Sequence, residues 1–196
     1  SGEKEAEYAA QGILLGFPNA EGTICDLGGN SVEFANICKN IVTDCNSALL
    51  GPLIIKKLEG EFGNLGRYMQ EQLSSAINVN RIKNKSFFLI GGSWRAIAKI
   101  HMQRTKYPLK MIQGYKVASK KLKKTLEFIR GSSFLTKYHE MNISLERLEL
   151  LPQSSHLLEI MIDELQIKAL TFSSFGVREG LIYQHLSEVE KKKDPL

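Results

Sequence analysis

The chain has few residues of the kinds that build covalent or metal frameworks. Only three of its 196 residues are cysteine, and no two of them form a Cys-x-x-Cys pair. An odd number at these spacings excludes a disulfide framework and a cysteine zinc site. The four histidines lack a His-x-x-x-His spacing, so we expect core or surface histidines instead of metal ligands. These residues are Cys25, Cys38 and Cys45, and His101, His139, His156 and His185.

Long apolar runs, repeats and low-complexity segments are also missing. No stretch of roughly 18 apolar residues could span a membrane, and we expect no signal peptide before the domain. No segment recurs at a fixed period. We therefore expect a cytoplasmic location and no membrane partner.

What the sequence does contain suits one compact domain with a basic surface. Hydrophobic residues make up 43% of the chain, enough at this length to bury about 70% of the unfolded surface. Lysine and arginine total 26 against 21 acids, a net charge of +5 that favours a polyanionic ligand. The excess gathers at residues 116–130 and 191–193. Such runs are more often solvated helix faces, and we expect no nucleic-acid partner.

Residues 22–33 read GTICDLGGNSVE, an apolar strand that places an acid before a glycine turn and a second strand. Gly28 and Gly29 can adopt positive φ and let backbone N–H groups approach an anion. Asp26, at the strand end, is placed to hold a hydrated cation. Glu33 follows across the turn, and strand alternation alone cannot say which way it points. An ordinary hairpin with incidental acids is the alternative interpretation.

A second glycine junction follows the apolar strand predicted at 86–90. Gly91, Gly92 and Ser93 lead into a helix predicted at 94–102. The start of a helix offers unpaired N–H groups and the positive end of its dipole to an anion. A short connection with Ser93 as a simple N-cap is the alternative. Two such junctions in one chain favour phosphate binding.

The remaining patterns predict strands alternating with helices, and thus an α/β layered domain. We expect helices at 1–16, 65–77, 119–130 and 157–165, and a last helix after Gly176. Further strands are expected at 31–38, 40–45 and 168–173. The basic helix at 119–130 has a buried side formed by Leu122, Leu126 and Ile129.

Five segments together resemble the Ppx/GppA phosphatases, a family of exopolyphosphatases and guanosine pentaphosphate phosphohydrolases. In order they are SGEKEA (1–6) with Gly12 following, DLGGNSVE (26–33), GGSWRA (91–96), YPL (107–109) and FGVREGLIY (175–183). The resemblance implies the actin, Hsp70 and sugar-kinase (ribonuclease H-like) fold, with a mixed sheet flanked by helices. In that fold, two α/β halves close over a phosphate chain and its Mg²⁺.

The chain resembles the second half only, because no acid-plus-Gly-Ser-Asn turn of a first half occurs here. We expect residues 1–187 to form the second lobe and residues 188–196 to be a basic tail or the start of a linker. The first lobe is expected to be absent, which would make the chain a fragment. The resemblance also implies a homodimer for the parent protein.

The resemblance assigns roles to individual residues. Glu5 matches the proposed catalytic Glu that orients and deprotonates the attacking water, and an exposed helix carboxylate is the alternative. Asp26 would bind Mg²⁺, and Glu33 would help hold the metal or the water. The phosphate-binding residues would be Gly28, Gly29, Asn30, Ser31, Gly91, Gly92 and Ser93. Arg178 and Glu179 match a closing Arg-Glu-Gly motif, where we favour a packing ion pair.

Three positions depart from the family pattern. Lys4 stands where a second acid is common, and it favours the ionised form of Glu5. Asn30 replaces a third glycine, and Asn tolerates the left-handed region better than most residues. Val32 replaces the usual Thr. The changes at Asn30 and Val32 therefore put the affinity of this turn for phosphate in question.

The function implied is hydrolysis of the terminal phosphate of inorganic polyphosphate, with guanosine pentaphosphate (pppGpp) as the alternative substrate. A kinase of the same fold group would use both glycine turns to hold ATP, but should lack the Glu5 motif. A non-catalytic fragment that binds an alarmone or packs on a partner is the third interpretation.

Overall fold

We describe the fold from a computed structural model. The structure describes residues 1–60, 64–77, 86–131, 134 and 143–193. His139 and the end of the predicted tail, 194–196, lie outside the described residues.

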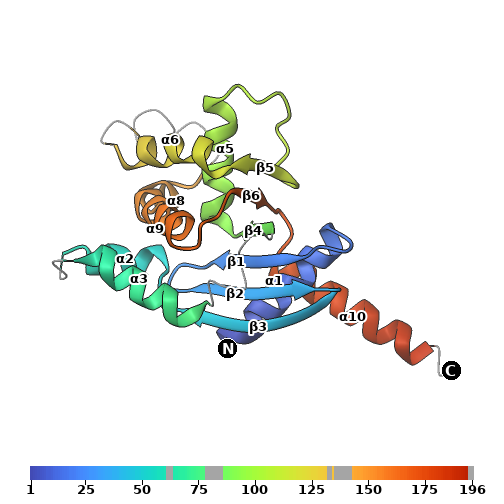
Figure 1. Cartoon of the computed structure of the whole chain (residues 1–196). Coiled ribbons are helices and arrows are strands. Elements are labelled where there is room, and N and C mark those ends of the chain that lie inside the picture. Colours follow the sequence, from blue (N-terminus) through green and yellow to red (C-terminus); the bar gives the residue numbers. More distant parts are fainter. Residues whose placement is uncertain (61–63, 78–85, 132–133, 135–142, 194–196) are drawn as a thin grey trace.

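A six-stranded mixed sheet forms the middle layer, in the order β3-β2-β1-β4-β6-β5 (Figure 1). The pairs β1–β4 and β4–β6 are parallel, whereas β1–β2, β2–β3 and β5–β6 are antiparallel. The strands are β1 (Gly22–Leu27), β2 (Val32–Cys38), β3 (Ile41–Ala48), β4 (Ser86–Ile90), β5 (Tyr115–Ala118) and β6 (Ala169–Phe172).

Helices cover both faces of this sheet, which confirms the predicted α/β fold. One face is covered by α1 (Gly2–Gly16), against which α10 (Val177–Lys193) packs. The other helices are α2 (Pro52–Leu58), α3 (Leu65–Ala76), α5 (Gly92–Arg104), α6 (Ser119–Arg130), α8 (Leu145–Glu149) and α9 (Leu151–Glu164). Within the described ranges, no helix combines the length and apolarity needed to cross a bilayer.

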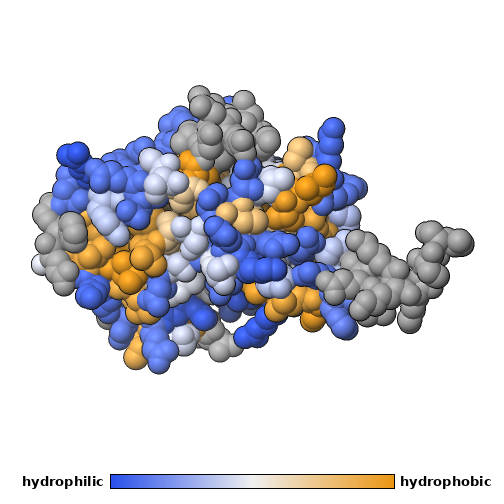
Figure 2. Space-filling view, turned by 90° about the horizontal axis from the view of Figure 1, so that it is seen from below, coloured by the Kyte–Doolittle hydropathy of each residue, from blue (hydrophilic) through white to orange (hydrophobic). Residues whose placement is uncertain are grey.

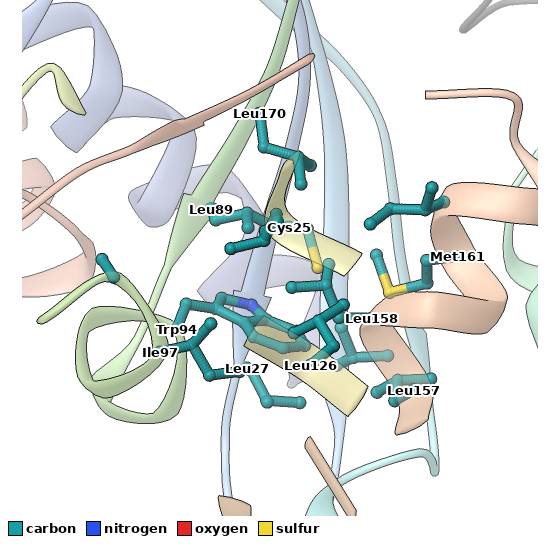
Figure 3. Packing of buried hydrophobic residues seen from close by; sticks show 14 of the residues in the cluster. Cys25, Leu27, Leu89, Trp94, Ile97, Leu126, Leu157, Leu158, Met161 and Leu170 are labelled. Carbon is teal, nitrogen blue, oxygen red and sulfur yellow. The ribbon is translucent and has the colours of Figure 1, made fainter. Parts of the chain in front are cut away.

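Strand alternation divides the apolar side chains between two cores. Cys25 and Leu27 of β1 point into the larger core, where Trp94 packs with side chains of α6 and α9 (Figure 3). Ile24 points the other way, into the smaller core beneath α1. Successive residues of a strand face opposite sides, so Asp26 shares the side of Ile24 and faces α1.

The pairing of α1 with α10 depends on glycine. A Cβ at Gly180 would lie 1.8 Å from the carbonyl oxygen of Tyr8, and one at Gly12 would lie 2.2 Å from that of Gly176. Neither backbone could approach the other with a larger residue at these positions. The glycines of the first and last motifs thus bring the two ends of the chain together.

The exposed surface mixes apolar and polar areas. Figure 2 shows apolar patches separated by hydrophilic ones on the face seen from below. Leu181, Ile182 and Leu186 of α10 are among the exposed large apolar side chains. Helix α10 continues to Lys193, through most of the segment predicted as a tail or linker.

Several elements differ from the sequence prediction. We did not predict α2, β5 or α8, each of which has seven residues or fewer. Helix α9 begins at Leu151 instead of 157, because Pro152 is tolerated in a first turn, where no intrahelical N–H bond is required. Strand β3 continues to Ala48, beyond the predicted end at 45. Helix α5 begins at Gly92, so Gly91 is the N-cap and the alternative of Ser93 in that position was wrong.

Candidate active site

Asp26 and Glu33 lie directly opposite each other on β1 and β2. The antiparallel register pairs these two residues. Opposed residues project from the same face, with Cα atoms about 4.5–5.5 Å apart. The direction of Glu33, which the sequence left open, is therefore toward the α1 side, beside Asp26.

Burial and mutual repulsion favour the protonated forms of these acids. Burial raises the pKa of Asp26 from 3.8 to about 7, with further increases from Glu33 and Glu5 that Arg95 partly opposes. Burial also raises the pKa of Glu33, which is only 2% exposed. Ser47 Oγ donates a hydrogen bond to Glu33 Oε1 at 3.0 Å. A cation placed between the two carboxylates would favour their ionised forms.

The loop that joins β1 to β2 leaves a row of backbone donors without partners. The N–H of Gly28 donates to the carbonyl of Ser31 at 3.0 Å. Among the described residues, nothing accepts from the N–H groups of Gly29, Asn30 and Ser31. Gly29 and Asn30 are exposed. Three consecutive unpaired amides at this position can hold the oxygens of a phosphate.

The start of α2 fixes this loop from behind. Gly51 N–H donates to the carbonyl of Asn30 at 2.9 Å, and Leu53 N–H donates to that of Gly29 at 3.0 Å. A Cβ at Gly51 would lie 2.3 Å from the Gly29 oxygen, so only glycine fits there. We did not predict a role for Gly51 from the sequence. Its position directly before Pro52, at the start of a helix, was the local pattern that could have indicated one.

Gly28 and Gly29 do not use the positive φ that glycine allows. The described glycines with positive φ are Gly22, Gly91 and Gly114, and Asn30 also lies outside the left-handed region. Because the start of α2 holds the carbonyl oxygens of Gly29 and Asn30, the loop turns without any residue in the left-handed region. The replacement of a third glycine by Asn30 therefore costs no backbone strain.

The second glycine junction lies against the first. The parallel register pairs Asp26 with Ile90, so Gly91 follows at the same edge of the sheet. Gly91 has φ +115°, and a Cβ there would lie 2.6 Å from the Leu27 oxygen and 3.0 Å from Asp26 Oδ1. Helix α5 then starts with Gly92 and Ser93, whose N–H groups have no acceptor in the described part of the chain.

Two arginines that the sequence analysis did not assign lie beside this junction. The Arg95 charge lowers the pKa of Asp26, and the Arg147 guanidinium carbon would lie 2.8 Å from a Cβ at Gly92. Both line a cavity of about 240 Å³ with Lys99 and Ser174. Arg95 could have been found from its place in the first turn of a helix. Arg147 carried no local signal, since α8 reaches α5 only through tertiary packing.

Glu5 lies on the first turn of α1, exposed, on the same side of the sheet as the paired acids. Its charge raises the pKa of both Asp26 and Glu33. A Cβ at Gly2, one turn away, would lie 3.6 Å from Glu33 Oε1. The structure thus places Glu5 on the same side of the sheet as two acids that follow it by more than 20 residues.

The donor set fits a magnesium ion that is shared with phosphate. Among the described residues, no group of three or more His, Cys, Asp or Glu side chains could hold a metal ion. Mg²⁺ does not require such a group, because it binds through one or two carboxylates and keeps waters beside phosphate oxygens. The half-buried Asp26 and the buried Glu33, which repel each other, could supply these ligands.

The expected ion pair between Arg178 and Glu179 is not among the ion pairs of the described residues. Glu179 Oε2 instead accepts a hydrogen bond from the Gly176 N–H at 2.7 Å. A carboxylate at this position satisfies an unpaired donor at the start of α10 and interacts well with the helix dipole. Arg178 is exposed.

The mixed six-stranded sheet flanked by helices is that of the actin-like ATPase fold, and a candidate phosphate site lies at the strand ends. Comparison with protein families matches residues 1–189 to the Ppx/GppA phosphatase family. The chain belongs to this family. No curated protein matches the chain.

Solved structures show the same fold. An exopolyphosphatase from Cytophaga hutchinsonii superposes with a TM-score of 0.79 at 18% identity, over 95% of this chain and 64% of that one. The Ppx/GppA family member of Aquifex aeolicus gives 0.78 at 18% identity, over 98% and 64%. The chain thus spans less than two thirds of these relatives.

Proposed function

We propose that this chain supplies the second-lobe half of an active site that hydrolyses the terminal phosphate of inorganic polyphosphate. The observation that carries the proposal is the opposed pair Asp26 and Glu33, with Glu5 on the same side, beside two junctions with unpaired amides. Phosphoryl transfer depends on positioning and on neutralising phosphate oxygens more than on covalent chemistry. This arrangement supplies both.

In the reaction, a water oxygen attacks the terminal phosphorus and the bridging P–O bond breaks. The electron pair of that bond leaves with the shortened chain, and orthophosphate is released. Glu5 takes the proton of the attacking water, as a general base on the same side of the sheet as the acid pair. Exposure on the first turn of α1 leaves its carboxylate open to this water.

Mg²⁺, when bound, neutralises phosphate oxygens and polarises the terminal phosphorus. Asp26 would hold the ion, and Glu33 would hold the ion or the water beside it. The unpaired amides of Gly29, Asn30 and Ser31 bind the terminal phosphate, and Gly28 shapes the loop through its N–H bond to the Ser31 carbonyl. Gly91, Gly92 and Ser93 bind the phosphates that follow, at the positive end of α5.

Guanosine pentaphosphate is the second candidate substrate, since it presents the same terminal phosphoanhydride. The cavity beside Arg95 and Arg147 is also lined by Ile112 and Ile143. Apolar and cationic walls together suit a nucleoside with attached phosphates.

Orthophosphate release tests the proposal, with and without Mg²⁺, from long-chain polyphosphate and from guanosine pentaphosphate. The chain is assayed alone and joined to a first lobe, because its solved relatives are longer. We expect Mg²⁺-dependent release of orthophosphate, without mid-chain fragments, from the two-lobed protein. Mg²⁺-dependent binding of guanosine pentaphosphate without release from either compound would favour the non-catalytic interpretation instead.

A further inference from the structure

A second cationic cavity lies between the C-terminal end of α5 and the N-terminal half of α6. It has a volume of about 470 Å³, which is in the range of small-molecule sites. Its lining contains cations and hydroxyl groups but no acid. The lining residues are His101, Arg104, Thr105, Lys120, Lys121, Lys124 and Thr125.

This cavity is remote from the acid pair. Helix α5 starts at the Gly91 junction and runs for 13 residues to Arg104, which spans about 18 Å at 1.5 Å per residue. Figure 1 shows α5 leading away from the end of β4, with α6 beside it. A ligand in the cavity therefore does not occupy the phosphate loops of the candidate active site.

The basic residues of α6 divide into a paired and an unpaired group. Lys123 forms an ion pair with Asp163, and Arg130 forms one with Glu159, both on α9. In contrast, Lys120, Lys121 and Lys124 have no acidic partner in the described part of the chain. Three ammonium groups that line one cavity without an ion-pair partner repel one another, and a bound anion would relieve this repulsion.

Two further side chains give the cavity fixed walls. The Arg104 guanidinium lies 3.9 Å from the centroid of the Phe128 ring, which holds it between α5 and α6. His101 is only 3% exposed, and its Nδ1 lies 2.7 Å from Thr125 Oγ1. Its other ring nitrogen, Nε2, has no hydrogen-bond partner among the described residues. This nitrogen is a polar group on a buried residue of the cavity wall.

The electrostatic field and the helix geometry both favour an anion here. Burial lowers the pKa of His101, and the charges of Arg104 and Lys121 lower it further. The first turn of α6 contains no acid, and no side chain caps its N-terminus. The positive end of the α6 dipole thus adds to the three lysines.

We propose that this cavity is a second, non-hydrolytic binding site for a compact anion with two or more linked phosphoryl groups. Lysine and arginine bind phosphate oxygens by charge-assisted hydrogen bonds, and linked phosphoryl groups offer enough charge for four cations at once. The proposal does not depend on the hydrolytic function, because it uses none of the acids. Tripolyphosphate and nucleoside triphosphates share this chemistry.

Calorimetric titration with tripolyphosphate tests the site, in EDTA so that no metal supports binding at the acids. We expect saturable binding that weakens about tenfold or more in the variant Lys120→Gln, Lys121→Gln, Lys124→Gln. The matched control is Lys39→Gln, Lys57→Gln, Lys116→Gln, which removes the same charge from exposed positions. Its affinity should stay within about twofold of the parent.

A variant of the candidate active site locates the bound anion. Arg95→Gln, which removes a cation beside the acid pair, should bind tripolyphosphate as the parent does. The proposal is overturned by absent saturable binding, by equal losses in the two triple variants, or by a loss confined to Arg95→Gln. Parallel titrations with guanosine triphosphate distinguish a nucleotide from an inorganic polyphosphate as the ligand. Tighter binding than tripolyphosphate indicates a nucleoside contact, and equal binding indicates recognition of the phosphates alone.

Discussion

At the residue scale, Asp26 connects the candidate active site to folding stability. Its pKa is about 7 in the folded chain and 3.8 ordinarily. Between these values the folded state keeps a proton that the unfolded state has released, so the free energy of unfolding falls as pH rises from about 4 to about 7. In the absence of metal, the Asp26 carboxylate is thus a source of instability at neutral pH.

Replacing this acid should remove that loss. Without metal, Asp26→Asn should be more stable than the parent at about pH 8, by up to about 4 kcal/mol at 1.36 kcal/mol per pKa unit. The two proteins should differ little near pH 4. Urea unfolding in EDTA measures both. Glu3→Gln, at an exposed position, is the control. If the free energy of unfolding of Asp26→Asn depended on pH as strongly as that of the parent, the burial argument would be contradicted.

Individual residues of the candidate site differ in how far the sequence alone could predict their positions. Asp26 and the glycines became candidates from local pattern alone, because an acid at a strand end before a glycine turn indicates a site for a cation and a phosphate. Predicting that Glu33 lies opposite Asp26 required the pairing register of the two strands. The alternation of side chains along one strand does not give this register. Arg147 was missed because only tertiary packing brings it to Gly92.

At the element scale, the strand-to-helix junction depends on Gly91. Gly91→Ala would place a Cβ 2.6 Å from the Leu27 oxygen in a backbone conformation with φ +115°. We expect a loss of stability of about 2–3 kcal/mol or more from strain and displacement of β1. Thermal unfolding measures this loss. The matched control is Gly60→Ala, because a Cβ at Gly60 meets nothing within 4 Å; equal losses in both variants would contradict the claim.

Helices with a clear apolar stripe were predicted well from the sequence. The stripe at 65–77 corresponds to α3, and the one at 119–130 corresponds to α6. The missed elements α2, β5 and α8 are too short for a period to emerge. Strand β5 exists because it pairs with β6, an interaction that no local pattern reports.

At the scale of the whole molecule, the cations should attract polyphosphate over a distance. The net charge is +5, and the cavities along α5 are lined by lysine and arginine. Raising sodium chloride from about 50 to about 300 mM should increase KM for polyphosphate several-fold and leave kcat nearly unchanged, since screening weakens association more than chemistry. Initial rates of orthophosphate release in the two-lobed protein measure this. A KM independent of salt would contradict electrostatic capture.

The closure of the chain ends is the second property of the whole molecule. Gly180→Ala should separate α10 from α1, because its Cβ would lie 1.8 Å from the Tyr8 oxygen. Since α1 carries Glu5, we expect lower stability, by about 2 kcal/mol or more, together with lower activity. Thermal unfolding and the phosphate assay test this. A variant that keeps full activity despite reduced stability would show that Glu5 does not depend on the α1–α10 contact.

The most direct test of the account is kcat for orthophosphate release from polyphosphate by Glu5→Gln in the two-lobed protein, compared with Glu3→Gln. Both acids lie on the first turn of α1 and are exposed, so the pair controls for charge and helix stability. The account predicts that Glu5→Gln lowers kcat by about a hundredfold or more with KM within about twofold, and that Glu3→Gln resembles the parent. Full activity in Glu5→Gln, or equal losses in both variants, would contradict the assignment of Glu5 as the general base.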